Sequence, residues 1–298
     1  MTEWRSLLIG AVVLAACGNA KDDLTEIQKS PTAIAREVRL EKSLADHNAA
    51  LAGEPLAQWF LPQALKEISG LALTKDGRLL THGDETGEIS EIDYRRGILA
   101  KHFWVGERSV KGDFEAITIA NDTVFLMNSN GSIYEFREGA EGEHVAFKEF
   151  DTGLKRACEF EGLAFDPSIQ SLLLACKHVH DKDIHNSIVI YKWSLAGDST
   201  SRVSKLVVPL GASVSANGWK DLHPSDITIN PFNGDYILVS SLERALIEIT
   251  PAGEVVFVRR LPERHHQPEG VALTKDSILI VSDEGKTLRA MITLYKWQ

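Results

Sequence analysis

The sequence is poor in the residues and motifs that mark several large classes of protein. It has three cysteines in 298 residues and no Cys-x-x-Cys spacing, which excludes a disulfide scaffold and a zinc ribbon. Acidic residues outnumber basic ones by 42 to 32, giving a net charge of −10, so no nucleic-acid partner is expected. Gly-x-Ser-x-Gly, His-Glu-x-x-His and P-loop motifs are all absent, so no common hydrolase or nucleotide site is indicated. The apolar fraction of 44% and charged fraction of 25% are those of an ordinary globular protein.

The apolar run at the N-terminus is short. Residues 6–16 are apolar or small, too few to span a bilayer comfortably as a helix, and have the build of a secretory signal peptide. The run ends in Leu14-Ala15-Ala16-Cys17, which resembles the bacterial lipoprotein signal, in which the cysteine is acylated and becomes the first residue. We therefore expect residues 1–16 to be removed and Cys17 to carry the lipid; the alternative is an ordinary signal peptide. Asn19 resembles the pattern sorted to the outer membrane, with the protein facing the periplasm.

The next segment, residues 17–57, mixes acids and bases without strand alternation. A helix over roughly 32–51 is consistent with its scattered apolar residues. We interpret the segment as a lipidated tether; a helix packed on the following domain is the alternative.

Residues 58–298 contain an internal repeat. Five apolar strands each open with a carboxylate and recur at intervals mostly in the forties; their first residues are Glu67, Glu115, Glu161, Asp226 and Glu269. Strands and Gly-, Asp-, Asn- or Pro-rich turns follow each of them. A period of this length with strand-rich units is typical of a β-propeller blade.

The strand count predicts an all-β fold, a β-propeller of five four-stranded blades. Each unit can be divided into four strands except the last, which has three before the chain ends. A further strand at 58–61 precedes the first unit. We predict that it completes the last blade and closes the ring, because closure removes two exposed strand edges. A sixth blade would require a unit that we do not find.

The repeat predicts an acidic mouth at one end of the channel. In a propeller the first strand of each blade lines the channel, and the antiparallel second strand ends beside its start. The five carboxylates should therefore meet side chains from the second-strand ends, which include Asp84, Asn128, Lys177, Ser240 and Asp283.

Repulsion among these acids requires compensation. Oxygen ligands at flexible spacing suit Ca²⁺, so the five carboxylates are candidate metal ligands and the five second-strand residues candidate ligand-binding residues. Two alternatives stay open. The acids could cap strand ends as purely structural groups, or an anion or organic ligand could bind through Lys177.

Two cysteines fall in strands that should be adjacent. Cys158 lies three residues before Glu161, and Cys176 directly precedes Lys177. The periplasm permits disulfides, but the sequence does not fix the register of these strands, so a bridge and two free thiols are both possible.

Several segments together resemble the SdiA-regulated, YjiK-like family. These are Glu67-Ile68-Ser69-Gly70-Leu71, Asp84-Glu85-Thr86-Gly87, Asp113-Phe114-Glu115-Ala116-Ile117, Phe160-Glu161-Gly162-Leu163-Ala164, His223-Pro224-Ser225-Asp226 and Gln267-Pro268-Glu269-Gly270-Val271. The resemblance implies a β-propeller of the bacterial envelope with no firmly assigned activity. More distant Ca²⁺-dependent lactonases and esterases have a similar channel-mouth site, but their acid and amide ligands do not map cleanly onto this chain.

Two functions follow as hypotheses. The first is a lipid-anchored propeller without catalysis that binds a divalent cation, a small molecule or an envelope protein at the acidic mouth. The second is a Ca²⁺-dependent hydrolase of an ester, lactone or phosphoester, with an uncoordinated carboxylate as general base.

Overall fold

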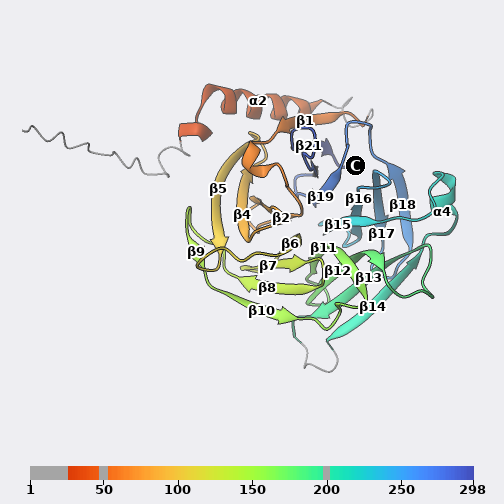
Figure 1. The fold of residues 1–298 in the computed structure, drawn as a ribbon. Helices are drawn as coiled ribbons and strands as arrows, with labels where there is room; N and C mark the ends of the chain where they lie inside the picture. Colours follow the sequence, from red (N-terminus) through yellow and green to blue (C-terminus); the bar gives the residue numbers. More distant parts are fainter. Residues whose placement is uncertain (1–25, 47–52, 197–201) are drawn as a thin grey trace, which may run out of the picture.

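The computed structural model describes residues 26–46, 53–196 and 202–298. It confirms the predicted β-propeller, with five sheets around a central channel (Figure 1). Blade 1 contains β2 (Leu71–Leu73), β3 (Leu79–His82), β4 (Glu88–Asp93) and β5 (Ile98–Val105). Blade 2 contains β6 (Phe114–Ala120), β7 (Thr123–Asn128), β8 (Ser132–Phe136) and β10 (Phe147–Asp151). Blade 3 contains β11 (Cys158–Asp166), β12 (Ser171–Val179), β13 (Ser187–Ser194) and β14 (Val203–Pro209). Blade 4 contains β15 (Pro224–Ile229), β16 (Tyr236–Ser240), β17 (Ala245–Ile249) and β18 (Val255–Arg260). Blade 5 contains β19 (Pro268–Leu273), β20 (Ile278–Asp283), β21 (Met291–Lys296) and, from the other end of the domain, β1 (Pro55–Phe60).

The ring is closed by β1, as the sequence predicted. This strand pairs with β21 as the outermost strand of blade 5, with Gln58 opposite Thr293 and Trp59 opposite Ile292. The pairing begins at Pro55, three residues before the predicted start. Each inner strand contacts the next around the channel, and β19 of the last blade contacts β2 of the first. Closure leaves β1 joining the two ends of the domain.

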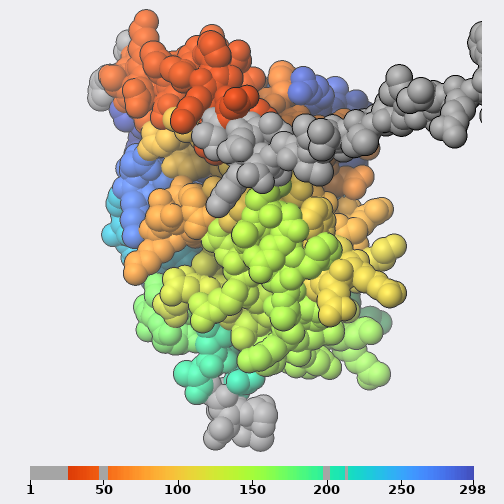
Figure 2. Space-filling view, turned by 90° about the vertical axis from the view of Figure 1, so that its left-hand side faces the viewer, coloured from red at the N-terminus to blue at the C-terminus, as the bar shows by residue number. Residues whose placement is uncertain are grey.

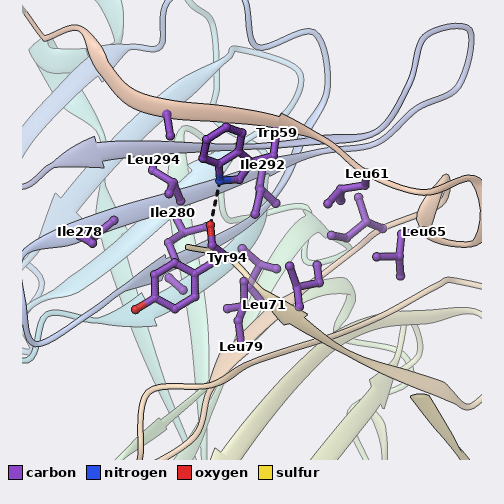
Figure 3. Packing of buried hydrophobic residues seen from close by; sticks show 14 of the residues in the cluster. Trp59, Leu61, Leu65, Leu71, Leu79, Tyr94, Ile278, Ile280, Ile292 and Leu294 are labelled. Carbon is purple, nitrogen blue, oxygen red and sulfur yellow. Dashed lines mark hydrogen bonds between the residues drawn. The ribbon is translucent and has the colours of Figure 1, made fainter. Parts of the chain in front are cut away.

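Trp59 fixes the closing strand to blade 1 as well as to blade 5. Its indole Nε1 donates a hydrogen bond to the carbonyl of Tyr94 at 2.8 Å (Figure 3). The indole of Trp59 also lies against Gly97, which adopts a φ of +64°, and a Cβ at this glycine would clash with Cγ of Trp59. Only glycine combines this left-handed conformation with so close an approach.

The hydrophobic core is divided among the five interfaces between neighbouring blades. One cluster of buried residues lies between each pair, and the cluster between blades 5 and 1 includes Trp59, Leu71 and Ile292. Two further short elements, a 3₁₀ helix at Gln63–Leu65 and α4 (Gly211–Ala216), lie in the connections. Because each sheet buries both faces against its neighbours, a single blade has no core of its own.

A helix, α2 (Pro31–Ala45), lies on the outside of the ring above β1 (Figures 1 and 2). It begins after Ser30, whose side chain accepts a hydrogen bond from the Ala33 N–H, a common N-cap arrangement. Leu40 is fully buried in the cluster between blades 5 and 1, and Arg36 donates to the carbonyls of Arg96 and Gly97. Over these residues the chain is packed on the propeller rather than free. None of the described helices is long and apolar enough to cross a membrane.

One segment crosses from blade 2 to blade 1. β9 (His144–Val145) pairs in parallel with β5 of blade 1, and the outer strand of blade 2 begins only at Phe147. The reason is burial, since Val145 packs into the cluster between blades 1 and 2.

Candidate functional site

The site is built on a β-bulge that recurs at the start of the inner strands. In four blades the pairing with the second strand shifts at one residue, which is Glu115, Glu161, Ser225 or Glu269. Ser69 takes this place in blade 1, since its N–H donates to the carbonyl of His82 and Leu71 lies opposite Thr81. A bulge leaves one residue without a ladder partner and re-aims its side chain. The bulged residues therefore share one end of the channel.

The sequence alignment was out of register in two blades. It matched Glu67 and Asp226 to the three glutamates, but the strand pairings put Ser69 and Ser225 at the equivalent positions. Glu67 lies two residues before the bulge position and Asp226 one residue after it. Because side chains alternate along a strand, a shift of one residue changes the direction in which a side chain points.

Glu115, Glu161 and Glu269 form an acidic cluster around one lysine. Lys177 Nζ lies 2.6 Å from Glu161 Oε1. Burial acts to lower the pKa of Lys177, but the attraction of these glutamates outweighs it and the pKa is raised. The lysine is supplied by β12, as the sequence predicted for a second-strand end. We call these four residues the glutamate cluster.

Burial is the largest cause of the raised pKa values of the three glutamates. Burial, reinforced by repulsion from Glu161 and Asp113, raises the pKa of Glu115 to about 9. Burial also raises the pKa of Glu161 to about 7, against the opposing effect of Lys177. The pKa of Glu269 is raised by burial too, although hydrogen bonds oppose the shift. One lysine thus faces three carboxylates, and the pKa of each of the three is raised.

Two polar residues outside the set of predicted site residues hold Glu269 in place. Its Oε1 accepts hydrogen bonds from Gln267 Nε2 at 2.9 Å and from Ser241 Oγ at 3.1 Å. Gln267 Nε2 also donates to Glu284. The spacing in the sequence could have identified Gln267, because a residue two positions before the bulged residue lies at the same mouth of the channel.

Glu67 and Asp84 belong to a neighbouring acidic group on blade 1. Both raise the pKa of Glu284 by repulsion, after burial, which is the larger cause. They line a cavity of about 360 Å³ that also includes Glu85 and Glu88. This group is joined to the glutamate cluster through the amide of Gln267.

Asp226 points into the channel and accepts hydrogen bonds from three blades. Its Oδ1 accepts from the Ile227 N–H at 2.8 Å, and its Oδ2 accepts from Val271 at 2.8 Å and Leu71 at 3.4 Å. The side chain is fully buried, and burial raises its pKa well above the ordinary value against the effect of these N–H groups. The equivalent residues in the other blades are Gly70, Ala116, Gly162 and Gly270. The structural role that was left open for the acids is therefore visible at Asp226.

Two of the predicted ligand-binding residues, Asp283 and Ser240, form hydrogen bonds within the protein. Asp283 accepts from His265 Nδ1 at 2.7 Å and from the Gln267 N–H at 3.1 Å. Ser240 donates to Glu243. Asn128 is buried, and its Oδ1 has no hydrogen-bond partner among the described residues. Within residues 26–46, 53–196 and 202–298, no three His, Cys, Asp or Glu side chains are placed to hold a metal ion together.

A disulfide joins the two cysteines that the sequence left undecided. Cys158 of β11 is bonded to Cys176 of β12, with Cα atoms 5.6 Å apart. The bond lies in the two strands that supply Glu161 and Lys177. It restricts relative movement of the strands that carry this ion pair.

A family model described as SdiA-regulated matches residues 43–291. The chain belongs to the SdiA-regulated family. This confirms the resemblance drawn from the sequence motifs, and the match runs from the end of α2 to the first residue of β21.

Solved structures similar to this chain share its fold at low identity. The PQQ-bound aldose sugar dehydrogenase of Streptomyces coelicolor is 13% identical with a TM-score of 0.54, covering 80% of this chain and 98% of that one. The glutaminyl cyclase of Myxococcus xanthus is 12% identical with a TM-score of 0.53, covering 81% and 94%. Comparison with curated proteins gives no match. These likenesses concern the fold alone.

Proposed function

We propose that this protein is an envelope lipoprotein whose propeller binds a positively charged ligand at the glutamate cluster, without catalysis. The observation that carries the proposal is the geometry of the mouth, where three half-buried or buried glutamates share one lysine. A ligand cation would provide the missing positive charge.

The donor set favours a cation but does not form a ready cage for Ca²⁺. Oxygen atoms are the ligands that Ca²⁺ takes, and it needs six to eight of them. Among the described residues the carboxylates are not gathered into such a set, and Lys177 already contacts Glu161. An organic ammonium group needs fewer oxygens, since it donates three hydrogen bonds. Ca²⁺ and a small amine share the required charge, and the test below separates them.

Binding of either cation should depend on pH in a defined direction. A cation binds the ionised carboxylates, so it must displace the protons that burial places on Glu115 and Glu161. Affinity should therefore rise with pH between about 6 and 9. The limit is roughly tenfold per pH unit for each proton released, by linkage.

The test is a thermal-stability and calorimetric titration of the full chain. CaCl₂ and 1,5-diaminopentane are the two probes, and KCl at equal ionic strength is the control for screening. A ligand that binds only the folded state raises the melting temperature. At one hundred times its Kd it stabilises the folded state by about 2.7 kcal/mol. Glu115→Gln and Glu161→Gln should reduce the shift. Glu254→Gln, an exposed acid on an outer-strand hairpin, should not.

The outcomes separate the ligand classes. A shift with CaCl₂ alone would indicate a metal site, and a shift with the diamine alone an amine site. If neither probe shifts the melting temperature beyond the KCl control at pH 9, the proposal is wrong and the glutamates are structural.

A second candidate is a hydrolase that uses the same cluster. The observation that favours it is the pair Glu115 and Glu161, whose pKa values of about 9 and about 7 would allow one to hold a proton while the other ionises. Turnover of ester, lactone or phosphoester substrates that Glu115→Gln and Glu161→Gln both abolish would support it. An unaltered rate in both variants would exclude these residues from catalysis.

Lipid anchoring is proposed from the sequence, because Cys17 lies outside the described residues. Cys17→Ser should release the protein from the outer-membrane fraction and remove the acyl mass from its N-terminus. If the variant stays membrane-bound and the wild type carries no acyl group, this part of the proposal fails.

A further inference from the structure

The end of the channel opposite the glutamate cluster has a different chemical character. Here the inner strands end, and one apolar residue from each blade lines a shared cavity of about 1150 Å³. These residues are Leu73, Ile119, Phe165, Ile229 and Leu273. They are repeat equivalents, each placed two residues after a matched strand position. We call them the apolar floor.

The floor is not simply the interior of the protein. Each of its five residues packs at the edge of a different core cluster. All except Leu273 are only partly buried, so four apolar side chains from four blades face the cavity with exposed surface. A concave, mainly apolar surface with a few polar groups at its edge is the usual form of a small-molecule site.

The rim of the cavity carries two lysines on equivalent turns. Blades 1 and 5 have the same sequence, Leu-Thr-Lys-Asp, which starts at the last residue of each inner strand and places Lys75 and Lys275 on the rim. Both side chains are exposed, and neither forms a salt bridge to any described residue. Because blades 1 and 5 are neighbours in the closed ring, the lysines flank one side of the cavity.

The acids beside these lysines are already engaged by arginines. Asp76 accepts from Arg78 at 2.9 Å, and Asp276 accepts from Arg95. Asp122 is the other acid of the rim. The charged side chains that line the cavity are balanced, with Lys75, Arg95 and Lys275 against Asp76, Asp122 and Asp276. The two lysines are the basic side chains of this rim that form no salt bridge to a described residue.

We propose that this cavity binds a soluble amphiphilic anion, with its apolar body on the floor and its carboxylate between Lys75 and Lys275. A medium-chain carboxylate fits both features, because its chain needs an apolar surface and its single negative charge lies at one end. The site is at the opposite end of the channel from the glutamate cluster, so the proposal does not depend on the function proposed there.

The experiment is calorimetric titration of the full chain with three ten-carbon probes of different charge. Cys17→Ser is used as the parent so that no acyl chain competes for the cavity. Decanoate should bind at one saturable site. Decyltrimethylammonium, which has the same chain and the opposite charge, should bind more weakly, and decanol should fall between them.

Variants then separate the head group from the chain. Lys75→Gln with Lys275→Gln should weaken decanoate roughly tenfold, as expected for two exposed charge pairs, and leave decanol unchanged. Phe165→Thr should weaken all three probes. The matched control, Lys155→Gln with Lys220→Gln, removes two exposed lysines that do not line the cavity and should have no effect.

Several results would overturn the proposal. These are the absence of saturable decanoate binding, equal binding of decyltrimethylammonium, or no effect of the paired rim variant. Sedimentation with anionic or neutral vesicles without binding of free decanoate would assign the surface to a membrane instead. Glu115→Gln should leave decanoate binding unchanged; a loss would mean that the two mouths are not independent.

Discussion

Replacing Asp226 by alanine should destabilise the propeller more than any other single change of a channel carboxylate. The side chain is fully buried and accepts N–H groups from Ile227, Val271 and Leu71, which belong to three blades. Each buried N–H left without an acceptor costs about 1–3 kcal/mol. The two bonds at 2.8 Å dominate, and loss of an unfavourably buried carboxyl offsets part of the cost. We therefore expect Asp226→Ala to lower the free energy of unfolding by about 2–4 kcal/mol.

Asp226→Asn separates hydrogen bonding from charge. The asparagine side chain keeps one carbonyl oxygen that can accept from the Val271 and Leu71 N–H groups. The substitution should therefore lower the free energy of unfolding by only about 1 kcal/mol at neutral pH. The pKa of Asp226 is raised by burial, so the folded state holds its proton to a higher pH than the unfolded chain does. Wild-type stability from this group is present at low pH and is lost as pH rises above the unfolded value. The difference between wild type and Asp226→Asn should therefore shrink with increasing pH.

The assay is urea unfolding followed by circular dichroism at several pH values, with the m-value held as a check on the two-state transition. Asp122→Ala, which removes an exposed carboxylate at the opposite mouth, should stay within about 0.5 kcal/mol of wild type. The reasoning is refuted if Asp226→Ala lies within 1 kcal/mol of wild type, or if the asparagine and alanine variants are equally unstable.

Three further predictions concern closure, the disulfide and the glutamate cluster. Deleting residues 1–62, which removes β1, should prevent cooperative folding, whereas deleting 1–52 should cost only the contacts of α2; equal melting temperatures for the two truncations would argue against closure by β1. Replacing Cys158 and Cys176 by serine should lower stability by roughly 3 kcal/mol, the chain-entropy value for a loop of this size, and added reductant should affect only the wild type. Because burial raises the pKa of Glu115 to about 9 from 4.5, wild-type stability should fall between these pH values, and Glu115→Gln should flatten that dependence in pH-resolved melting curves.

The sequence by itself determined the architecture of this protein. Blade number, strand order and the closing role of β1 follow from a repeat of apolar strands and turns with one strand missing at the end. These features are local and periodic, so each unit can be identified without knowing its neighbours. The same reasoning correctly gathered Glu115, Glu161, Glu269 and Lys177 at one mouth, because antiparallel pairing fixes which strand ends lie together.

Tertiary structure decided what the repeat could not. Ser69 and Ser225 occupy the bulge position in their blades that Glu161 occupies in blade 3. The position of each bulge depends on pairing with the second strand rather than on the inner strand alone. A carboxylate at the start of a strand was therefore an unreliable marker of register. Asp226 accepts hydrogen bonds from three blades and is not a member of the glutamate cluster. Contacts between distant segments, such as Trp59 against Gly97, likewise depend on the closed ring. Such contacts depend on packing between two blades, and a local sequence pattern describes only one of the two packed surfaces.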